Sequence, residues 1–593
     1  MTERPPPLLG VAQSYGGQLW QERAYDERQV LALSQRLGLP DTVARLLDQR
    51  GVGLEQAEAF LNPRLRDSLP DPLVLKDMDR AVERLTRAIT AKEPVAVFGD
   101  YDVDGATSSA LLQRFFASLG RSLRVYIPDR LKEGYGPNET ALRLLAEEGQ
   151  RVVITVDCGT TAHAALQEAA RLGLEVLVID HHVAETALPP ALALVNPNRL
   201  DDESGAGSLA AVGVVFLLLV AVNRALRQAG FFDSAGLQEP PLMEWLDLVA
   251  LGTVADVAPL QGLNRVLVAQ GLKVMAARRN RGLAALLAVS GLADSVSAGQ
   301  VGFQLGPRVN AGGRVGQADL GAKLLACNAP DQAERLAQEL DRLNRERQEI
   351  EAEVLAQAVA QVEQGPPQEG LLIAAGEAWH PGVIGIVAAR LRERFGLPAL
   401  VLSLEGEEAK GSARSVPGFD LGALILRARA EGLLLAGGGH RMAAGLTAAR
   451  GQIPALSSFL QGEAAAALAE TGYQATLEID AVVAAPSLDL VAGAERLAPF
   501  GVGNPQPRFV LPNQRLAQVD IMAERHLRLR LQSEQGQDLR AVAFRAMEGP
   551  LGPALLAARG RPLHVAGKLE RDLWRGGQSL QLIVEDAAEV SPL

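Results

Sequence analysis

Residues 95–112 read VAVFGDYDVDGATSSALL, an apolar run followed at once by aspartates on alternate positions and then by a glycine. The aspartates are Asp100, Asp102 and Asp104. Because they follow a strand-like apolar run and precede a helix-like one, we expect them at the carboxyl end of a buried strand. Their spacing raises the question of which cation, if any, they bind.

The same alternation of apolar runs and helix-like stretches continues along the chain. The apolar runs are 95–98, 123–127, 152–156 and 176–179. Continuous hydrophobic strands, each followed by a helix, predict a parallel sheet covered on both faces. Ligands bind beyond the carboxyl ends of such strands, so Asp157 and the run Asp180, His181 and His182 should join Asp100 at one edge. Asp256, after an apolar helical stretch, is a further candidate.

Four explanations compete for the three aspartates. A calcium-binding EF-hand loop begins with this pattern, but its twelfth position is Leu111 instead of glutamate, which rejects it. A helix-capping acid explains one aspartate only. The nucleophile motif of haloacid-dehalogenase-like phosphatases has a similar pattern but leaves the later acids and histidines without a role. A binuclear metal site for hydrolysis of phosphate esters accounts for all of them, and carboxylates with imidazole favour Mn²⁺ or Mg²⁺.

The motifs DYDVDGAT, VDCG, DHH and TVADV, in this order, resemble the DHH phosphoesterase family. GGGHRMAAG (437–445) resembles the glycine-rich signature of the DHH-associated substrate domain, and GPRVNAGGR (306–314) and PFGVGNPQP (499–507) are similar to segments of the RecJ family of single-strand-specific exonucleases. The resemblance implies hydrolysis of single-stranded DNA from the 5′ end to 5′-mononucleotides, in DNA repair and recombination. It also implies single-stranded DNA, a helicase and a single-strand binding protein as partners.

The resemblance further implies roles for individual residues. Asp100 and Asp102 would bind one ion, and Asp104, His181 and Asp256 the other, with Asp157 bridging both. His182 would face the scissile phosphate, and Asp180 would orient an imidazole. A water shared by two ions about 3.5–4 Å apart would attack without a covalent intermediate. The implied substrate contacts are Arg308, Asn310, Arg314, Ser412, Arg414, Gly438, Gly439 and His440.

Five segments are predicted, which together give an α/β fold class. They are a helical appendage (1–75), a parallel-sheet DHH catalytic domain (76–329), a long connecting helix (330–364), a smaller α/β DHH-associated substrate-binding domain (365–472) and an OB-like β-barrel (473–593). A cleft between the two α/β domains is expected to hold the DNA strand. Basic residues of the barrel, with one tryptophan among them, indicate either a solvated strand face or a second DNA groove: Arg525, His526, Arg528, Arg530, Lys568, Arg571, Trp574 and Arg575.

The composition of the chain limits its possible functions, metal ligands and location only in part. The 593 residues carry a net charge of -12, and 4% are aromatic, so base stacking has few candidates. Two cysteines exclude a disulfide framework and a thiolate zinc site. The start MTERPPPLLG lacks a signal-peptide pattern, which favours the cytoplasm. A catalytically weak DHH scaffold, and a phosphodiesterase for short oligoribonucleotides or cyclic dinucleotides, stay open as alternatives.

Overall fold

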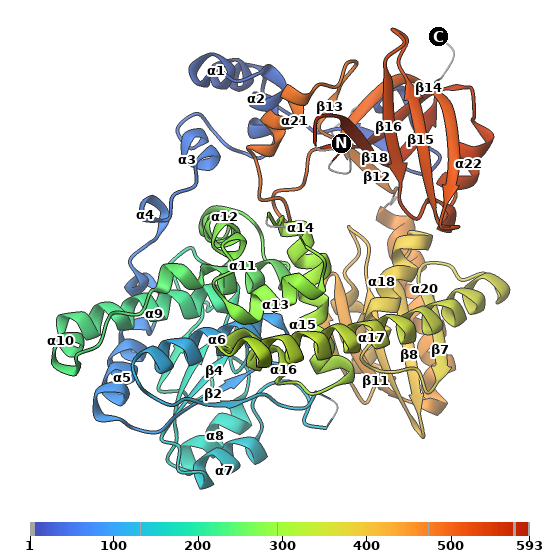
Figure 1. Ribbon diagram of the computed structural model, residues 1–593. Coiled ribbons are helices and arrows are strands. Elements are labelled where there is room, and N and C mark those ends of the chain that lie inside the picture. The colour runs from blue at the N-terminus through green and yellow to red at the C-terminus, as the bar shows by residue number, and fades with distance from the viewer. Residues whose placement is uncertain (1–5, 131, 293–294, 472–473, 573–576, 591–593) are drawn as a thin grey trace. The chain divides into compact units, whose positions relative to one another are not determined.

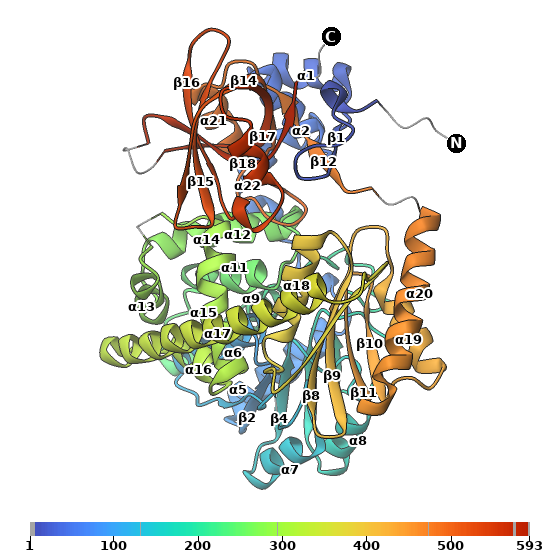
Figure 2. The same ribbon diagram turned by 90° about the vertical axis from the view of Figure 1, so that its right-hand side faces the viewer.

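The structure, a computed structural model, describes residues 6–130, 132–292, 295–471, 474–572 and 577–590. The chain forms two compact units (Figures 1 and 2). Unit 1 consists of residues 1–60, 348–497 and 506–593, and unit 2 of residues 61–347 and 498–505. Unit 1 therefore gathers three stretches that are distant in sequence.

A five-stranded parallel sheet forms the centre of unit 2, which confirms the predicted class of this domain. Its strand order is β3-β2-β4-β5-β6, and every neighbouring pair is parallel. The strands are β2 (Val95–Gly99), β3 (Arg124–Tyr126), β4 (Val152–Val156), β5 (Glu175–Ile179) and β6 (Ala193–Val195).

Helices cover both faces of this sheet, because successive strand residues point to opposite sides. Val95 and Val97 pack in one hydrophobic cluster, whereas Ala96 and Phe98 pack in another. The first cluster includes residues of α5 (Met78–Ala91), α6 (Val103–Ser118) and α9 (Ala211–Gln228), and the second includes residues of α7 (Glu139–Glu147) and α8 (His163–Arg171). Figure 1 shows α7 and α8 below the sheet and α6 and α9 above it.

Further helices complete unit 2. They are α4 (Leu65–Ser68), η2 (Pro72–Val74), α10 (Phe231–Ala235), η3 (Leu242–Trp245), α11 (Leu246–Ala255), α12 (Gly262–Ala276), α13 (Arg281–Val289), α14 (Ala298–Gln300), the π-helix η4 (Val301–Leu305), α15 (Gly306–Val315) and α16 (Leu320–Ala326). Among the described residues, α9 alone is long and apolar enough to cross a membrane, but 72% of it is buried in the fold. It is therefore the core helix of this unit.

The long helix α17 (Pro330–Gln364) leads from unit 2 into unit 1, as its uninterrupted charged sequence predicts. Residues 498–505 belong to unit 2, although the sequence predicts that they are part of the barrel segment, residues 473–593. There the Leu260 amide donates to the Val502 carbonyl at 2.7 Å, and the Arg265 guanidinium donates to the Ala498 carbonyl at 2.8 Å.

Unit 1 contains a second α/β fold around a mixed five-stranded sheet with the order β10-β11-β9-β8-β7. Only the β7–β8 pair is parallel. The strands are β7 (Leu372–Glu377), β8 (Ala399–Glu405), β9 (Glu408–Arg414), β10 (Ala436–His440) and β11 (Ala443–Ala449), and the helices are α18 (Ile384–Phe395), α19 (Leu421–Ala430), η5 (Arg450–Gln452) and α20 (Ile453–Thr471).

The C-terminal part of unit 1 is a β-barrel, as predicted. Strands β14, β15, β16, β18 and β17 follow one another in the sheet, and the β14–β17 pairing closes it. The elements are β13 (Ala481–Val482), α21 (Leu488–Glu495), β14 (Phe509–Met522), β15 (His526–Gln532), β16 (Asp538–Ala543), η6 (Ala546–Glu548), α22 (Leu551–Ala557), β17 (Pro562–Arg571) and β18 (Leu580–Glu589).

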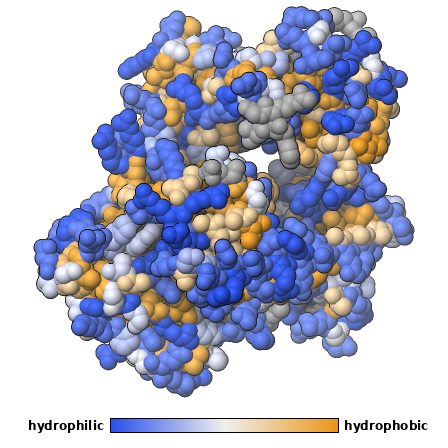
Figure 3. Space-filling view, in the orientation of Figure 1, coloured by the Kyte–Doolittle hydropathy of each residue, from blue (hydrophilic) through white to orange (hydrophobic). Residues whose placement is uncertain are grey.

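The N-terminal segment packs on this barrel and is not purely helical. Its elements are η1 (Leu8–Gly10), β1 (Leu19–Glu22), α1 (Glu27–Leu37), α2 (Asp41–Asp48) and α3 (Ala57–Leu61). Strand β1 pairs in parallel with β12 (Thr476–Ile479). The fully buried Trp20 donates its indole N–H to the Asp586 carboxylate at 2.9 Å. Figure 3 shows a mostly hydrophilic face with scattered hydrophobic residues, as is usual for folded domains in water.

Candidate metal centre

The carboxyl ends of three neighbouring strands bring acidic side chains to one edge of the sheet in unit 2. The backbone amide of Asp100 donates to the Val156 carbonyl at 3.3 Å, and that of Asp157 donates to the Ile179 carbonyl at 3.1 Å. Asp180 follows the next strand, β5, in the same way. The three aspartates therefore extend the sheet ladder by one residue each, and they lie where the strand pattern predicts.

The first turn of α6 positions the other two acids of the first motif. The Asp102 carboxylate caps α6 and accepts the amides of Asp104 and Gly105 at 2.9 and 3.1 Å. A Cβ atom on Gly105 would lie 2.4 Å from the Asp100 carbonyl oxygen, so only glycine fits there. The buried Asp104 carboxylate accepts the Ala211 and Val212 amides at 2.7 and 2.9 Å, at the positive end of α9.

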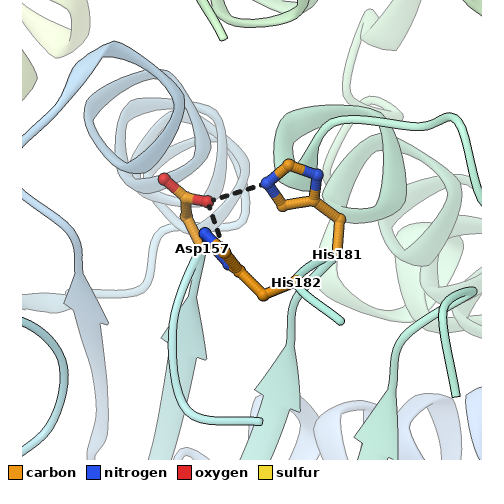
Figure 4. A group of neighbouring side chains, drawn as sticks. All are labelled: Asp157, His181 and His182. Carbon is orange, nitrogen blue, oxygen red and sulfur yellow. Dashed lines mark ion pairs between the residues drawn. The ribbon is translucent and has the colours of Figure 1, made fainter. Parts of the chain in front are cut away.

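These side chains form three overlapping groups of candidate metal ligands. The groups are Asp100, Asp102 and Asp157; Asp104, His181 and Asp256; and Asp157, His181 and His182, and the ligand atoms of each group lie within 4.8 Å of one another. The first two groups separate the side chains as the predicted division between two ions does, except that Asp157, which was expected to bridge both ions, belongs only to the first of them. The third group connects them, because Nε2 of His181 lies 3.3 Å from Oδ1 of Asp157 (Figure 4).

The chemistry of this cluster fits a divalent cation. Oδ1 of Asp100, Oδ1 of Asp157 and Nε2 of His181 are buried and have no hydrogen-bond partner within the described part of the chain. Burial, with the charge of Asp102, raises the pKa of Asp100 to about 8 and that of Asp256 to about 7. Carboxylates that are this close together and lack hydrogen-bond partners lower the stability of the fold unless a positive charge lies between them. Oxygen ligands with one imidazole suit Mn²⁺ or Mg²⁺.

The two histidines have opposite electrostatic environments. Nδ1 of His182 lies 2.8 Å from Oδ1 of Asp180. Burial alone would lower the pKa of His182, but the hydrogen bond and charge of Asp180 raise it to about 9. Burial and the neighbouring His182 lower the pKa of His181. These shifts favour the unprotonated form of His181 at neutral pH, which is the form that could bind a metal ion, and the protonated form of His182.

Several residues of the site are absent from the sequence-based prediction. The Tyr135 hydroxyl donates to the Asp157 carbonyl at 3.0 Å and lies 3.3 Å from the His182 ring nitrogens. Side-chain amides of Asn196 and Asn198 donate to the carbonyls of His182 and His181 at 2.8 and 2.5 Å, which fixes the histidine backbone. Positive φ angles at Gly134 and Gly136, 84° and 79°, mark a tight loop around Tyr135, and this glycine pair is the sequence signal that could have indicated it.

Backbone strain also concentrates in this cluster. Asp157 has a φ of 60°, and Val257, which follows Asp256, has a φ of 63°. A positive φ is a true outlier for a β-branched residue such as Val257. Backbone strain of this kind persists where the surrounding structure holds a functional site in place.

The predicted substrate residues of unit 2 lie on α15, next to the first motif. A Cβ atom on Gly313 would lie 2.8 Å from the Tyr101 carbonyl oxygen, so the last turn of α15 packs directly on the aspartate loop. The Arg308 guanidinium donates to the Asp341 carboxylate at 2.9 Å and is partly committed to that ion pair. Asn310 and Arg314 are half-buried on the same helix. Their contact with DNA stays a prediction.

The other predicted substrate residues belong to unit 1 and form a group of their own. In the sheet register, Ser412 of β9 lies opposite Gly445 of β11, which in turn lies opposite Gly438 of β10. Two residues further along the strands, Arg414 of β9 and His440 of β10 lie on either side of Ala443 of β11. Gly439 lies between these two rows on β10. Ser412 accepts a hydrogen bond from the Arg414 guanidinium at 3.2 Å. One hydroxyl, one guanidinium and one imidazole therefore share the glycine-rich edge of this sheet.

The basic residues of the barrel are largely paired with acids. Arg528 lies 3.5 Å from Asp520, and Arg530 lies 3.7 Å from Asp538. Lys568 lies 2.7 Å from Glu585. This pairing favours the solvated strand face over a dedicated DNA groove for these side chains. Trp574 and Arg575 lie outside the described residues.

Known proteins share both the fold and the ligand motifs. Residues 94–253 match the DHH family, N-terminal domain, residues 368–466 match the DHHA1 domain, and residues 477–586 match the RecJ OB domain. A parallel sheet with acids and histidines at its strand ends that could bind a metal ion, followed by these two domains, defines a DHH-type phosphoesterase.

Individual relatives narrow the family. The single-stranded-DNA-specific exonuclease RecJ of Dickeya dadantii is 38% identical over 561 residues, which cover 92% of this chain and 96% of that protein. RecJ of Thermus thermophilus, solved in complex with Mn²⁺, gives a TM-score of 0.80 at 30% identity over 97% of this chain and 80% of that one. The same protein in complex with Mg²⁺ gives a TM-score of 0.73 at 28% identity over 97% of this chain and 79% of that one. The chain belongs to the RecJ family of single-stranded-DNA-specific exonucleases, which confirms the predicted enzyme class.

Proposed function

We propose that this chain removes 5′-mononucleotides from single-stranded DNA in the 5′-to-3′ direction by two-metal hydrolysis. The observation that carries the proposal is the pair of ligand groups connected by Asp157 and His181. The family supports the substrate class, since its members are named for single-stranded DNA, and RecJ of Thermus thermophilus has been solved in complex with Mn²⁺ and with Mg²⁺.

Two divalent cations, Mn²⁺ or Mg²⁺, would divide among these ligands. Asp100, Asp102 and Asp157 would hold one cation, and Asp104, His181 and Asp256 the other. When bound, such cations lower the pKa of a coordinated water and neutralise charge that develops on a phosphate.

The remaining groups of the site act through the protein. Asp180 holds Nδ1 of His182, which leaves Nε2 for the substrate. As a cation at neutral pH, His182 donates a hydrogen bond to a phosphate oxygen or a proton to the leaving oxygen. Asn196 and Asn198 fix the backbone of the histidine pair, so that both imidazoles keep their distance from Asp157. No side chain has to form a covalent intermediate.

The resemblance to the family also suggests a biological setting for this proposal. We place the enzyme in the cytoplasm, in DNA repair and recombination, beside a helicase that unwinds duplex and a single-strand binding protein that covers the product strand. A catalytically weak scaffold is disfavoured because every predicted ligand lies in the cluster. A phosphodiesterase for short oligoribonucleotides or cyclic dinucleotides is disfavoured because such substrates need no OB barrel.

The test is a time course on one oligonucleotide, single-stranded or as a blunt duplex, labelled at its 5′ or 3′ end. The proposal expects immediate release of labelled mononucleotide from the 5′ end of the single strand with Mn²⁺ or Mg²⁺, and none with EDTA or with Asp157→Ala. Immediate release of the label from the 3′ end would show that the enzyme degrades the strand in the 3′-to-5′ direction, which would contradict the proposed polarity. Retained binding without cleavage by the metal-loaded wild type would favour the scaffold.

A further inference from the structure

The motif PFGVGNPQP (499–507) has no role in the reaction proposed above. Residues 498–505 belong to unit 2, whereas the chain on both sides of them belongs to unit 1. Within this loop the backbones of Gly501 and Asn504 exchange two hydrogen bonds, at 2.9 and 3.1 Å. The side-chain amide of Asn504, which is 1% exposed, donates to the Pro499 carbonyl at 2.8 Å. The 498–505 loop therefore closes on itself inside the fold.

The 498–505 loop binds the segment that follows Asp256, a candidate metal ligand. The Val502 carbonyl accepts the backbone amide of the buried Leu260 at 2.7 Å. The next carbonyl of the loop accepts the side-chain amide of Gln261 at 2.9 Å. These two hydrogen bonds fix the path of the chain directly beyond the ligand.

Asp256 lies at a strained helix terminus. The Ala258 amide donates to the Thr253 carbonyl at 3.2 Å. The Val257 amide donates to the Val254 carbonyl, also at 3.2 Å, and the two bonds form a Schellman motif at the end of α11. Glycine usually takes the left-handed position of this motif, but here Val257 takes it, with a φ of 63°. Because Val257 is 62% exposed, its own packing offsets little of this strain.

We propose that the 498–505 loop positions the Asp256 carboxylate for one of the two metal ions. A strained backbone persists only where neighbouring structure holds it, and the hydrogen bond of Leu260 to the loop supplies such support just beyond Val257. Without that support, Val257 would relax toward an ordinary conformation and turn Asp256 away from the other ligands of its group, Asp104 and His181. The inference rests on the two-ion centre of the proposed function.

A Mn²⁺ titration of the full chain, followed by the EPR signal of free Mn²⁺, tests the inference. The variant Asn504→Ala removes the side chain that closes the loop, without touching the ligand cluster. It should weaken one of two Mn²⁺ sites about tenfold or more and leave the other within about twofold, as expected when support of a single ligand is lost. Cleavage of a short single strand should be slow at limiting Mn²⁺ and should recover as Mn²⁺ is raised.

A second substitution tests whether backbone strain connects the loop to the ligand. Glycine adopts the left-handed conformation without strain, so Val257→Gly makes this support unnecessary. Added to Asn504→Ala, it should restore the weakened Mn²⁺ site to within about threefold of wild type. A double variant whose weakened site is no tighter than that of Asn504→Ala would overturn the inference.

Asn223→Ala is the matched control, because Asn223 is a buried asparagine whose side-chain amide donates to Glu239 at 3.2 Å. It lies about 18 Å along α9 from Ala211, which contacts the metal centre. The control should lower the Tm as Asn504→Ala does and leave both Mn²⁺ sites within about twofold. If Asn504→Ala melts below the control, Gln261→Ala is the milder variant and should weaken the same site about threefold.

The inference fails if the loop variants leave both Mn²⁺ sites unchanged, or if Asn223→Ala weakens them equally. Wild type that binds fewer than two Mn²⁺ would overturn the two-ion reaction itself, and this inference with it. The number of ions bound by wild type therefore distinguishes failure of the proposed function from failure of the role of the loop alone.

Discussion

Asp157→Asn should stabilise the metal-free protein and abolish its response to metal. Asp157 is buried, and its candidate ligand atom lies within 4.8 Å of those of Asp100 and Asp102. Two like charges at that distance repel by about 3.5 kcal/mol at an effective dielectric constant near 20. Burial and these neighbours raise the pKa of Asp157 well above its ordinary value, so folding must either take up a proton or bear the repulsion. A neutral amide of the same shape removes that cost.

Differential scanning calorimetry with EDTA or excess MnCl₂ measures both effects. A gain of about 3 kcal/mol corresponds to a rise in Tm of about 2–5 °C for the metal-free variant, because the entropy of unfolding grows with the number of residues that unfold together. Wild type should gain about 2.7 kcal/mol from Mn²⁺ at one hundred times its Kd, whereas the variant should gain far less. Asparagine also tolerates the positive φ of 60° at this position.

Asp233→Asn provides the control, because Asp233 is an exposed carboxylate on α10, away from the cluster. It should change neither the Tm nor the response to Mn²⁺. The reasoning is refuted if Asp157→Asn melts at or below wild type in EDTA, since the carboxylates would then not repel. It is equally refuted if Mn²⁺ stabilises the variant as much as wild type, since Asp157 would then not be a ligand.

Three further predictions address other parts of the structure. Asp180→Asn should reduce kcat at saturating Mn²⁺ by about 100-fold or more while it keeps the Mn²⁺-induced shift in Tm, because Asp180 holds His182 and is expected to bind no ion. Phe303→Ala should weaken oligo(dT) binding by about 1–3 kcal/mol without a change in Tm, since Phe303 is 86% exposed on the π-helix before α15; a Trp substitution should retain binding. Burial raises the pKa of Asp247 from 3.8 to about 7, so its contribution to stability is lost as pH rises through 7, and Asp247→Asn should raise the Tm most above pH 7 and least near pH 4. An equal gain at all pH values would contradict the last prediction.

The sequence predicts the strand-end acids because their positions depend on local pattern. A buried parallel strand is a continuous apolar run, and the residue after it lies at the ligand-binding edge, which places Asp100, Asp157 and Asp180 without knowledge of the full topology. Strand β6 escapes prediction because no helix separates it from β5, so it breaks the alternation of strand and helix on which the prediction rests. The pairing of β1 with β12 joins segments more than 450 residues apart, which no local pattern reveals.

The residues that complete the site lie on loops. Tyr135 follows β3 in a segment without helical or strand periodicity, and its role depends on a hydrogen bond to the backbone of Asp157. Asn196 and Asn198 follow the short β6 and act through their side-chain amides on carbonyls. The ion pair of Arg308 with Asp341 joins α15 to α17. Such contacts depend on how elements pack, and a single sequence does not record that packing.

Anomalous diffraction from crystals soaked in MnCl₂ tests the central claim most directly. We expect two manganese peaks in unit 2, one at ligand distance from Asp100, Asp102 and Asp157 and the other at ligand distance from Asp104, His181 and Asp256. A single peak, or peaks away from these side chains, would contradict the two-ion centre.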